Sequence, residues 1–94
     1  MEKISKRRKL QFIIYTYGTK VQEDIAIEEC SELIKAICKN RRNPSDETRK
    51  GIIDEIADVE IMLEQLKIIH SCSKDVEERI NYKIERQIDR IMNK

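Results

Sequence analysis

The six-residue sequence EECSEL places three carboxylates in a stretch that otherwise has the pattern of an amphipathic helix. These acids are Glu28, Glu29 and Glu32. A second pair, Glu55 and Asp58, has the same i, i+3 spacing within an apolar segment further along the chain. Carboxylate oxygens grouped on one side of a site are the ligands that a hard divalent cation such as Mg²⁺ prefers. The two pairs therefore indicate a metal site.

Helical periodicity puts both pairs on faces that must pack against other elements. Glu29 and Glu32 fall within the apolar arc of their helix, which consists of Val21, Ile25, Ala26, Leu33, Ala36 and Ile37. On the next helix, Glu55 lies within the apolar stripe and Asp58 lies at its margin. Removing an ionised carboxylate from water costs on the order of several kcal/mol, and neighbouring like charges add to that cost. A bound cation would offset it.

A simpler interpretation is that these acids lie at the rim of the packed surface and form ordinary ion pairs with Lys and Arg side chains. That interpretation would be preferred for a single Glu. Two acidic pairs, each within the apolar arc of its own long helix, favour the metal site because the cost of burying them is combined.

Breaks in the pattern divide the chain into four helical segments. Gly18 is a natural residue to end the first helix, and Thr19 with Gln22 forms a T-x-x-Q capping box for the second. Pro44 interrupts the chain before Ser45, which is an N-cap candidate for the third. The expected helices run from about residue 3 to 17, 19 to 39, 45 to 70 and 73 to nearly 94.

The composition favours one all-α domain over residues 1–94. Apolar and charged residues each make up 39% of the chain, which has one Pro, two Gly and no Trp. We expect an antiparallel four-helix bundle. A chain of 94 residues has a small core, so we also expect it to associate as a homodimer or homotetramer.

The net charge of +1 neither favours nor opposes a polyanionic partner. The three cysteines are odd in number and have no CxxC spacing, so they are expected to be buried small hydrophobic residues. No apolar run is long enough to span a membrane. These features predict a soluble, cytoplasmic protein without a membrane partner.

The order of the acidic motifs resembles the MazG-like, all-α nucleoside triphosphate pyrophosphohydrolases. The hallmark of that family is an E-E-x-x-E motif and an E-x-x-D motif on adjacent helices. Here EECSE is followed after 22 residues by EIAD. The segment INYKIERQI is similar to the family's N-x-K-x-x-R segment, with Asn81, Lys83 and Arg86 in register. The resemblance extends from about residue 22 to residue 88.

The resemblance implies a hydrolase that cleaves a nucleoside triphosphate between its α and β phosphorus atoms, giving the monophosphate and pyrophosphate. Mg²⁺ would be the cofactor, with Mn²⁺ as a substitute. Glu29, Glu32, Glu55 and Asp58 would be the metal ligands, and Glu28 would orient or deprotonate the attacking water. Such an activity serves nucleotide-pool sanitation or control.

The same resemblance assigns substrate contacts to the last helix. Lys83 and Arg86 would bind phosphate oxygens, and Asn81 would hydrogen-bond phosphate or sugar. Gln22 is a candidate for reading a base edge. Family members often have a Trp near the first helix, and this chain has none. The base and sugar preference therefore stays open, with Phe12, Tyr15 and Tyr17 as alternative aromatic residues.

The alternative function is a small helical nucleic-acid-binding or regulatory module without catalysis. Its basis is the basic sequence KRRK at residues 6 to 9, whose four cations would release counterions from a phosphate backbone. No aromatic residue is interleaved with these cations and no binding motif accompanies them. We therefore favour a solvated helix N-terminus, and nucleic acid is the less favoured partner.

Overall fold

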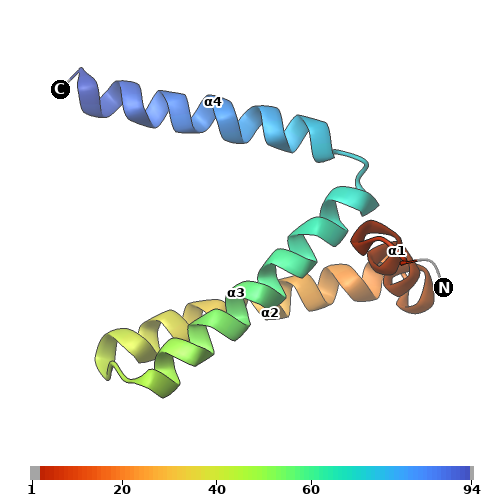
Figure 1. Ribbon diagram of the computed structural model, residues 1–94, viewed down its shortest axis with the longest axis horizontal. Helices are drawn as coiled ribbons and strands as arrows, with labels where there is room; N and C mark the ends of the chain where they lie inside the picture. The colour runs from red at the N-terminus through yellow and green to blue at the C-terminus, as the bar shows by residue number, and fades with distance from the viewer. Residues whose placement is uncertain (1–2, 94) are drawn as a thin grey trace.

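The computed structural model describes residues 3–93, and this part of the chain folds into four α-helices without a strand (Figure 1). Their bounds are α1 Lys6–Tyr17, α2 Thr19–Arg42, α3 Asp46–Ile69 and α4 Ser73–Met92. The all-α class and the four helices are thus confirmed. Each end lies within about one helical turn of its expected position.

Helices α2 and α3 lie side by side and form a helical hairpin that is closed by residues 43–45 (Figure 1). The start of α3 is fixed by a capping box. The Thr48 amide donates to the Ser45 hydroxyl at 3.1 Å, and the Ser45 amide donates to the Thr48 hydroxyl at 2.9 Å. The Thr48 hydroxyl also donates to the side chain of Asn40 at 2.7 Å, which attaches the loop to α2.

The capping box predicted for α2 is not formed. Gly18 is the N-cap residue, with φ of 94°, and no side chain caps this helix end. A left-handed φ suits glycine, which has no Cβ to clash with the backbone. Gln22 does not turn back to its own helix because its side chain points into the contact between α2 and α3.

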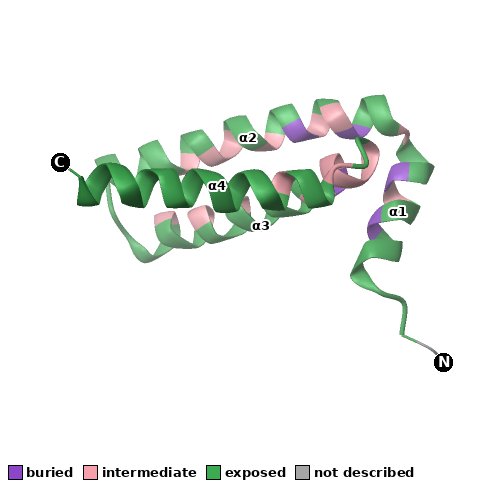
Figure 2. Ribbon diagram, turned by 90° about the horizontal axis from the view of Figure 1, so that it is seen from above, coloured by how far each residue is buried: buried purple, intermediate pink, exposed green. Residues whose placement is uncertain are grey.

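The buried residues gather where α1 crosses the hairpin (Figure 2). Four are apolar, namely Leu10, Ile14, Ala26 and Met62. The other two are Gln22 and Gln65, which are 3% and 2% exposed, and Nε2 of Gln22 donates to Oε1 of Gln65 at 2.7 Å. A hydrogen-bonded polar pair in an otherwise apolar contact favours one helix register, since any slip separates the two amides.

Helix α4 follows a tight turn at Ser71, where φ is 50°, and among the helices it contacts α3 alone. Beyond its first turns it diverges from the hairpin (Figure 1). No residue of α4 is buried, as the colouring of this helix in Figure 2 shows. The described part of a single chain is therefore a three-helix core with one projecting helix.

The cysteine prediction is wrong. Cys30 and Cys38 are exposed and Cys72 is half-buried. Cys30 and Cys38 lie outside the face of α2 that packs on α3, because that face is occupied by Gln22, Ala26 and their helical neighbours. None of the helices described over residues 3–93 has the length and apolar character needed to cross a membrane.

The Gln22–Gln65 pair gives the first testable prediction. Gln65→Leu leaves the Gln22 amide buried without its partner, so the free energy of unfolding should fall by about 1–3 kcal/mol. The double variant Gln22→Leu/Gln65→Leu should lose much less than the sum of the two single variants. Urea denaturation at one fixed chain concentration measures all four proteins of this cycle. Strictly additive losses would show that the two amides do not interact.

Candidate metal centre

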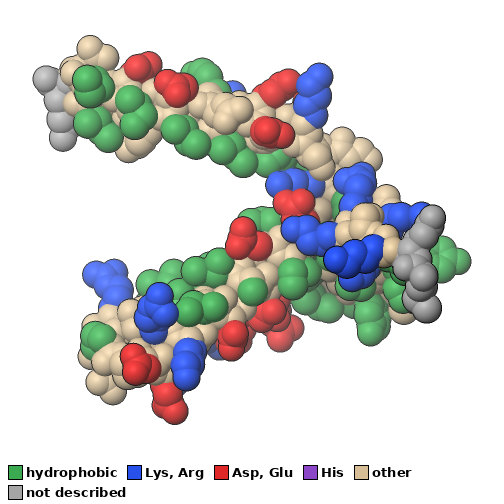
Figure 3. Space-filling view, viewed as in Figure 1, with side chains coloured by type: hydrophobic (Ala, Val, Ile, Leu, Met, Phe, Trp, Pro, Cys, Tyr) green, Lys and Arg blue, Asp and Glu red, His purple; other side chains and the backbone are tan. Residues whose placement is uncertain are grey.

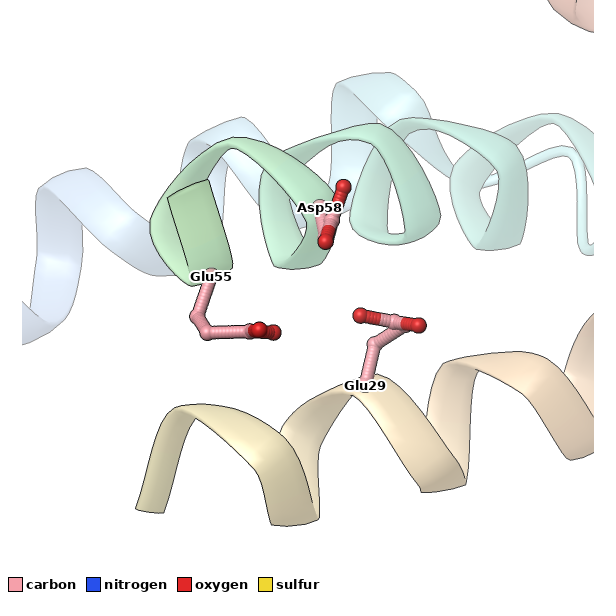
Figure 4. Close-up of side chains that lie close together, drawn as sticks. All are labelled: Glu29, Glu55 and Asp58. Atoms are coloured by element: carbon pink, nitrogen blue, oxygen red, sulfur yellow. The ribbon is translucent and has the colours of Figure 1, made fainter. Parts of the chain in front are cut away.

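Packing of α2 against α3 brings three of the expected acidic ligands together. Glu29 extends from α2, and Glu55 and Asp58 extend from successive turns of α3 (Figure 4). One carboxylate oxygen from each residue can be chosen so that all three lie within 4.8 Å of one another. The sequence placed these residues in one predicted site, and the structure shows the convergence that periodicity alone left open.

A small residue at the helix contact explains why carboxylates meet here. Ala26 is only 5% exposed and lies one turn before Glu29 on α2. A methyl side chain at a contact allows two helix backbones to approach closely. The side chains of Glu29 and Glu55 are consequently half-buried, while Asp58 stays exposed at the edge of the group.

The electrostatics of the group are unfavourable without a cation. The pKa of Glu29 is raised above its ordinary value of 4.5, first by its partial burial and then by the negative charges of Asp58 and Glu55. Oε2 of Glu55 is buried and has no hydrogen-bond partner. No Lys, Arg or His in the described chain forms an ion pair with any of the three acids.

Glu32 does not join the three converging carboxylates. Its side chain is partly exposed and forms an ion pair with Lys35 at 3.5 Å. For this one acid, the structure shows the ordinary ion pair that the simpler interpretation expected of all four. Glu28 is exposed on α2 beside Glu29, and its negative charge also contributes to the raised pKa of Glu29.

A groove of about 660 Å³ adjoins the acids and continues along the hairpin toward its loop. Glu32 and Glu55 line it from opposite helices, together with Lys35 and Lys39 of α2 and Lys50 of α3. These lysines were not among the functional residues predicted from the sequence. Their signal was the Lys35–Lys39 pair at i, i+4, which begins one turn after Glu32 and places both ammonium groups on one side of α2.

The other predicted substrate contacts lie elsewhere. Asn81, Lys83 and Arg86 are exposed on α4, in the part that diverges from the hairpin (Figure 1). Arg86 lies over the ring of Tyr82, at 5.7 Å from its centroid. Gln22 is buried in its bond to Gln65, and its Oε1 has no hydrogen-bond partner. None of these four residues belongs to the groove beside the acids.

The basic N-terminal segment faces acidic side chains of α3. Lys6 and Lys9 line a cavity together with Glu60 and Glu64. The pKa of Glu64 is lowered, chiefly by the hydrogen bond that it accepts from Lys67 at 2.7 Å and in smaller part by the charge of Lys6. Part of the positive charge proposed for nucleic-acid contact is therefore offset by the fold itself.

Comparison of the chain with protein-family models, with characterised proteins and with solved structures finds no match. The MazG-like assignment consequently stays a prediction from the motifs. The donor set fits a hard divalent cation on structural grounds: three carboxylates converge, one buried oxygen lacks a partner, and no cation of the described chain pairs with them.

The raised pKa of Glu29 predicts a pH dependence of stability in the metal-free protein. A carboxyl with a raised folded-state pKa favours folding below its unfolded pKa, and this contribution is lost as the pH rises through the folded-state value. In EDTA, Glu29→Gln should therefore melt above the wild type at pH 7, and the gap should close as the pH falls below 4.5.

The matched control is Glu78→Gln, which neutralises an exposed acid on α4, outside the acidic group. Its melting temperature relative to the wild type should not follow this trend. Thermal unfolding by circular dichroism across pH 4 to 8 makes the comparison. A Glu29→Gln protein that melts below the wild type throughout this range would contradict the electrostatic account.

Proposed function

We propose that the protein is a MazG-like, Mg²⁺-dependent nucleoside triphosphate pyrophosphohydrolase. The observation that carries the proposal is the convergence of Glu29, Glu55 and Asp58 from two helices without an ion pair to a cation of the described chain. If these acids belonged to structural ion pairs, a Lys or Arg would lie against them. The chain has 19 Lys and Arg residues that could have formed such pairs. The motif resemblance supports the same metal and the same substrate class.

Glu29, Glu55 and Asp58 would hold the metal. Glu32 is the fourth ligand in the proposal, because it lies one turn from Glu29 and its exposed ion pair with Lys35 is worth little free energy. When bound, Mg²⁺ supplies charge neutralisation for phosphate oxygens and orients them for displacement. Mn²⁺ has the same preference for oxygen ligands and would substitute.

The lysines of the groove would bind the phosphate chain. Lys35, Lys39 and Lys50 lie beside Glu32 and Glu55, so a triphosphate in the groove would contact ammonium groups and the metal together. Glu28 is exposed at the edge of the acidic group, where it can orient or deprotonate a water molecule. The reaction needs no protein nucleophile, and no such residue is proposed.

The proposal includes an antiparallel bundle formed by association of chains as a homodimer or homotetramer. Asn81, Lys83 and Arg86 lie on α4, which diverges from the hairpin (Figure 1), and none of them lines the groove of their own chain. If they contact substrate, they must do so in the groove of another chain. Their assignment is therefore tied to the assembly, whereas the assignment of the three acids is not.

The test is turnover of a nucleoside triphosphate panel with Mg²⁺, with release of pyrophosphate and monophosphate measured by chromatography. We expect turnover that EDTA abolishes, and a loss of at least about 100-fold for Glu55→Gln, since removing one charged ligand weakens both metal binding and charge neutralisation. Glu78→Gln, which removes an exposed acid from α4, should keep wild-type turnover.

Full turnover by Glu55→Gln, or no turnover of any nucleotide, would contradict the enzymatic proposal. The nucleic-acid alternative makes the opposite prediction. In that case, neutralising Lys6, Arg7 and Arg8 together would abolish binding of a short DNA or RNA duplex, while Glu55→Gln would leave that binding intact.

The groove lysines give a separate prediction. Lys39→Ala and Lys50→Ala should each raise KM about 5- to 50-fold with a smaller change in kcat, because an ammonium that binds phosphate in the ground state contributes chiefly to substrate affinity. Lys20→Ala is the matched control, since it removes an exposed lysine from the opposite end of α2. An unchanged KM in both groove variants would remove the lysines from the proposed substrate site.

A further inference from the structure

An unpartnered apolar surface lines the space between α4 and the hairpin. We call this the apolar jaw and define it by Ile80, Ile84, Ile88 and Ile91 on α4 and by Ile53, Ile56 and Leu63 on α3. All seven side chains are exposed. Figure 3 shows hydrophobic side chains along the face of α4 that is turned toward the hairpin and on the facing side of the hairpin.

Contacts at the base of the jaw identify its two faces. Ile80 of α4 and Leu63 of α3 line one shared cavity of about 770 Å³. Ile84, Ile88 and Ile91 follow Ile80 at helical spacing and therefore share its face of α4. Ile56 precedes Leu63 by seven residues, or two turns, and shares its face of α3. The two faces that meet at the base thus continue outward without a partner.

The accessible surface of the chain is larger than that of a compact monomer of the same mass. The accessible surface is 8185 Å², whereas a compact monomer of 11.2 kDa is expected to expose about 5,700 Å². The radius of gyration is 16.7 Å, against about 12 Å for a compact domain of 94 residues. If two chains each buried this excess of about 2,500 Å², the total of about 5,000 Å² would lie at the upper end of the range for obligate homodimers.

The charge of the chain does not oppose the association of two copies. The net charge is +1 per chain, so electrostatic repulsion between two copies is small.

The turn before α4 opposes closure of the jaw by the chain's own helix. The Ser71 amide donates to the Ile68 carbonyl at 3.2 Å, and the Cys72 amide donates to the Lys67 carbonyl at 3.0 Å. Val76 is half-buried against the base of the jaw. Folding α4 down onto its own α3 would require breaking this hydrogen-bonded turn, whereas a second chain can enter the jaw without disturbing it.

From these observations we infer that the apolar jaw is filled by α4 of a second copy of the chain. The exchange is reciprocal, so each α4 lies between the hairpin and α4 of the other chain, as twofold symmetry allows. None of the acids and lysines that line the groove belongs to the residues that define the jaw. The inference rests on the association of chains that the proposed function includes and names the surface that forms it. Because its test measures assembly, a failure of hydrolysis would not overturn it.

The test uses sedimentation equilibrium of the full chain, with Ile84→Glu as the variant and Tyr82→Glu as the control. Both replace a half-exposed apolar residue of α4 with the same acid, but Tyr82 lies on the opposite face, beneath Arg79. We expect the wild type and Tyr82→Glu to sediment as dimers or tetramers. Ile84→Glu should raise the dissociation constant about 100-fold or more.

Complementation distinguishes the exchange of α4 between chains from a simple failure of one variant to fold. Ile56→Glu changes the hairpin side of the jaw and should also prevent self-association. Mixing Ile84→Glu with Ile56→Glu leaves one intact contact, between the hairpin of the first variant and α4 of the second. The mixture should therefore recover dimer mass and helical circular dichroism that neither variant has alone.

Three results would overturn the inference. A wild type that is monomeric at 100 µM would show that the jaw is closed by its own α4 or is meant for a different protein. Self-association that survives in Ile84→Glu would place the contact elsewhere. A mixture that shows no recovery, although each variant alone is monomeric, would exclude a reciprocal exchange of α4.

Discussion

The structure depends on the packing of α2 against α3, which must accommodate negative charge within a contact that is otherwise apolar. Met62 and Ala26 supply the apolar part of this contact, and Gln22 with Gln65 supplies a buried polar pair. The same close approach brings the carboxylates of Glu29 and Glu55 together. Because burial and mutual repulsion both disfavour ionised carboxylates, this arrangement persists at a cost that a bound divalent cation would remove. The proposed chemistry is therefore placed at the contact on which the fold is built.

The hairpin separates two kinds of surface. One side has the acids, and from them the groove with Lys35, Lys39 and Lys50 extends toward the loop. The other side of the hairpin faces α4 and has hydrophobic side chains on its surface (Figure 3). Helix α4 itself has no buried residue. Such a division allows a chain of this size to associate through one side while the other stays open to a small charged ligand.

The core of a single chain is small for its length. Four apolar side chains are buried among the residues described, whereas α4 contributes none. Helices of this length gain most of their stability from packing of an apolar face rather than from intrinsic propensity. All isoleucines of α4 lie in the jaw or at its base. The stability of this helix therefore depends, more than that of the other helices, on what packs into the jaw.

The sequence by itself determined the class of the fold, the four helices and the pairing of acids within each helix, because these follow from periodicity and capping within short segments. The N-cap role of Ser45 was readable in this way. The convergence of Glu29 with Glu55 and Asp58, the diversion of Glu32 to Lys35, and the use of Gln22 in a buried pair were decided only by tertiary structure. Each of these features depends on the rotation and distance of one helix relative to another. Helical periodicity predicts which face of a helix packs, but it does not predict which residues of another helix that face contacts.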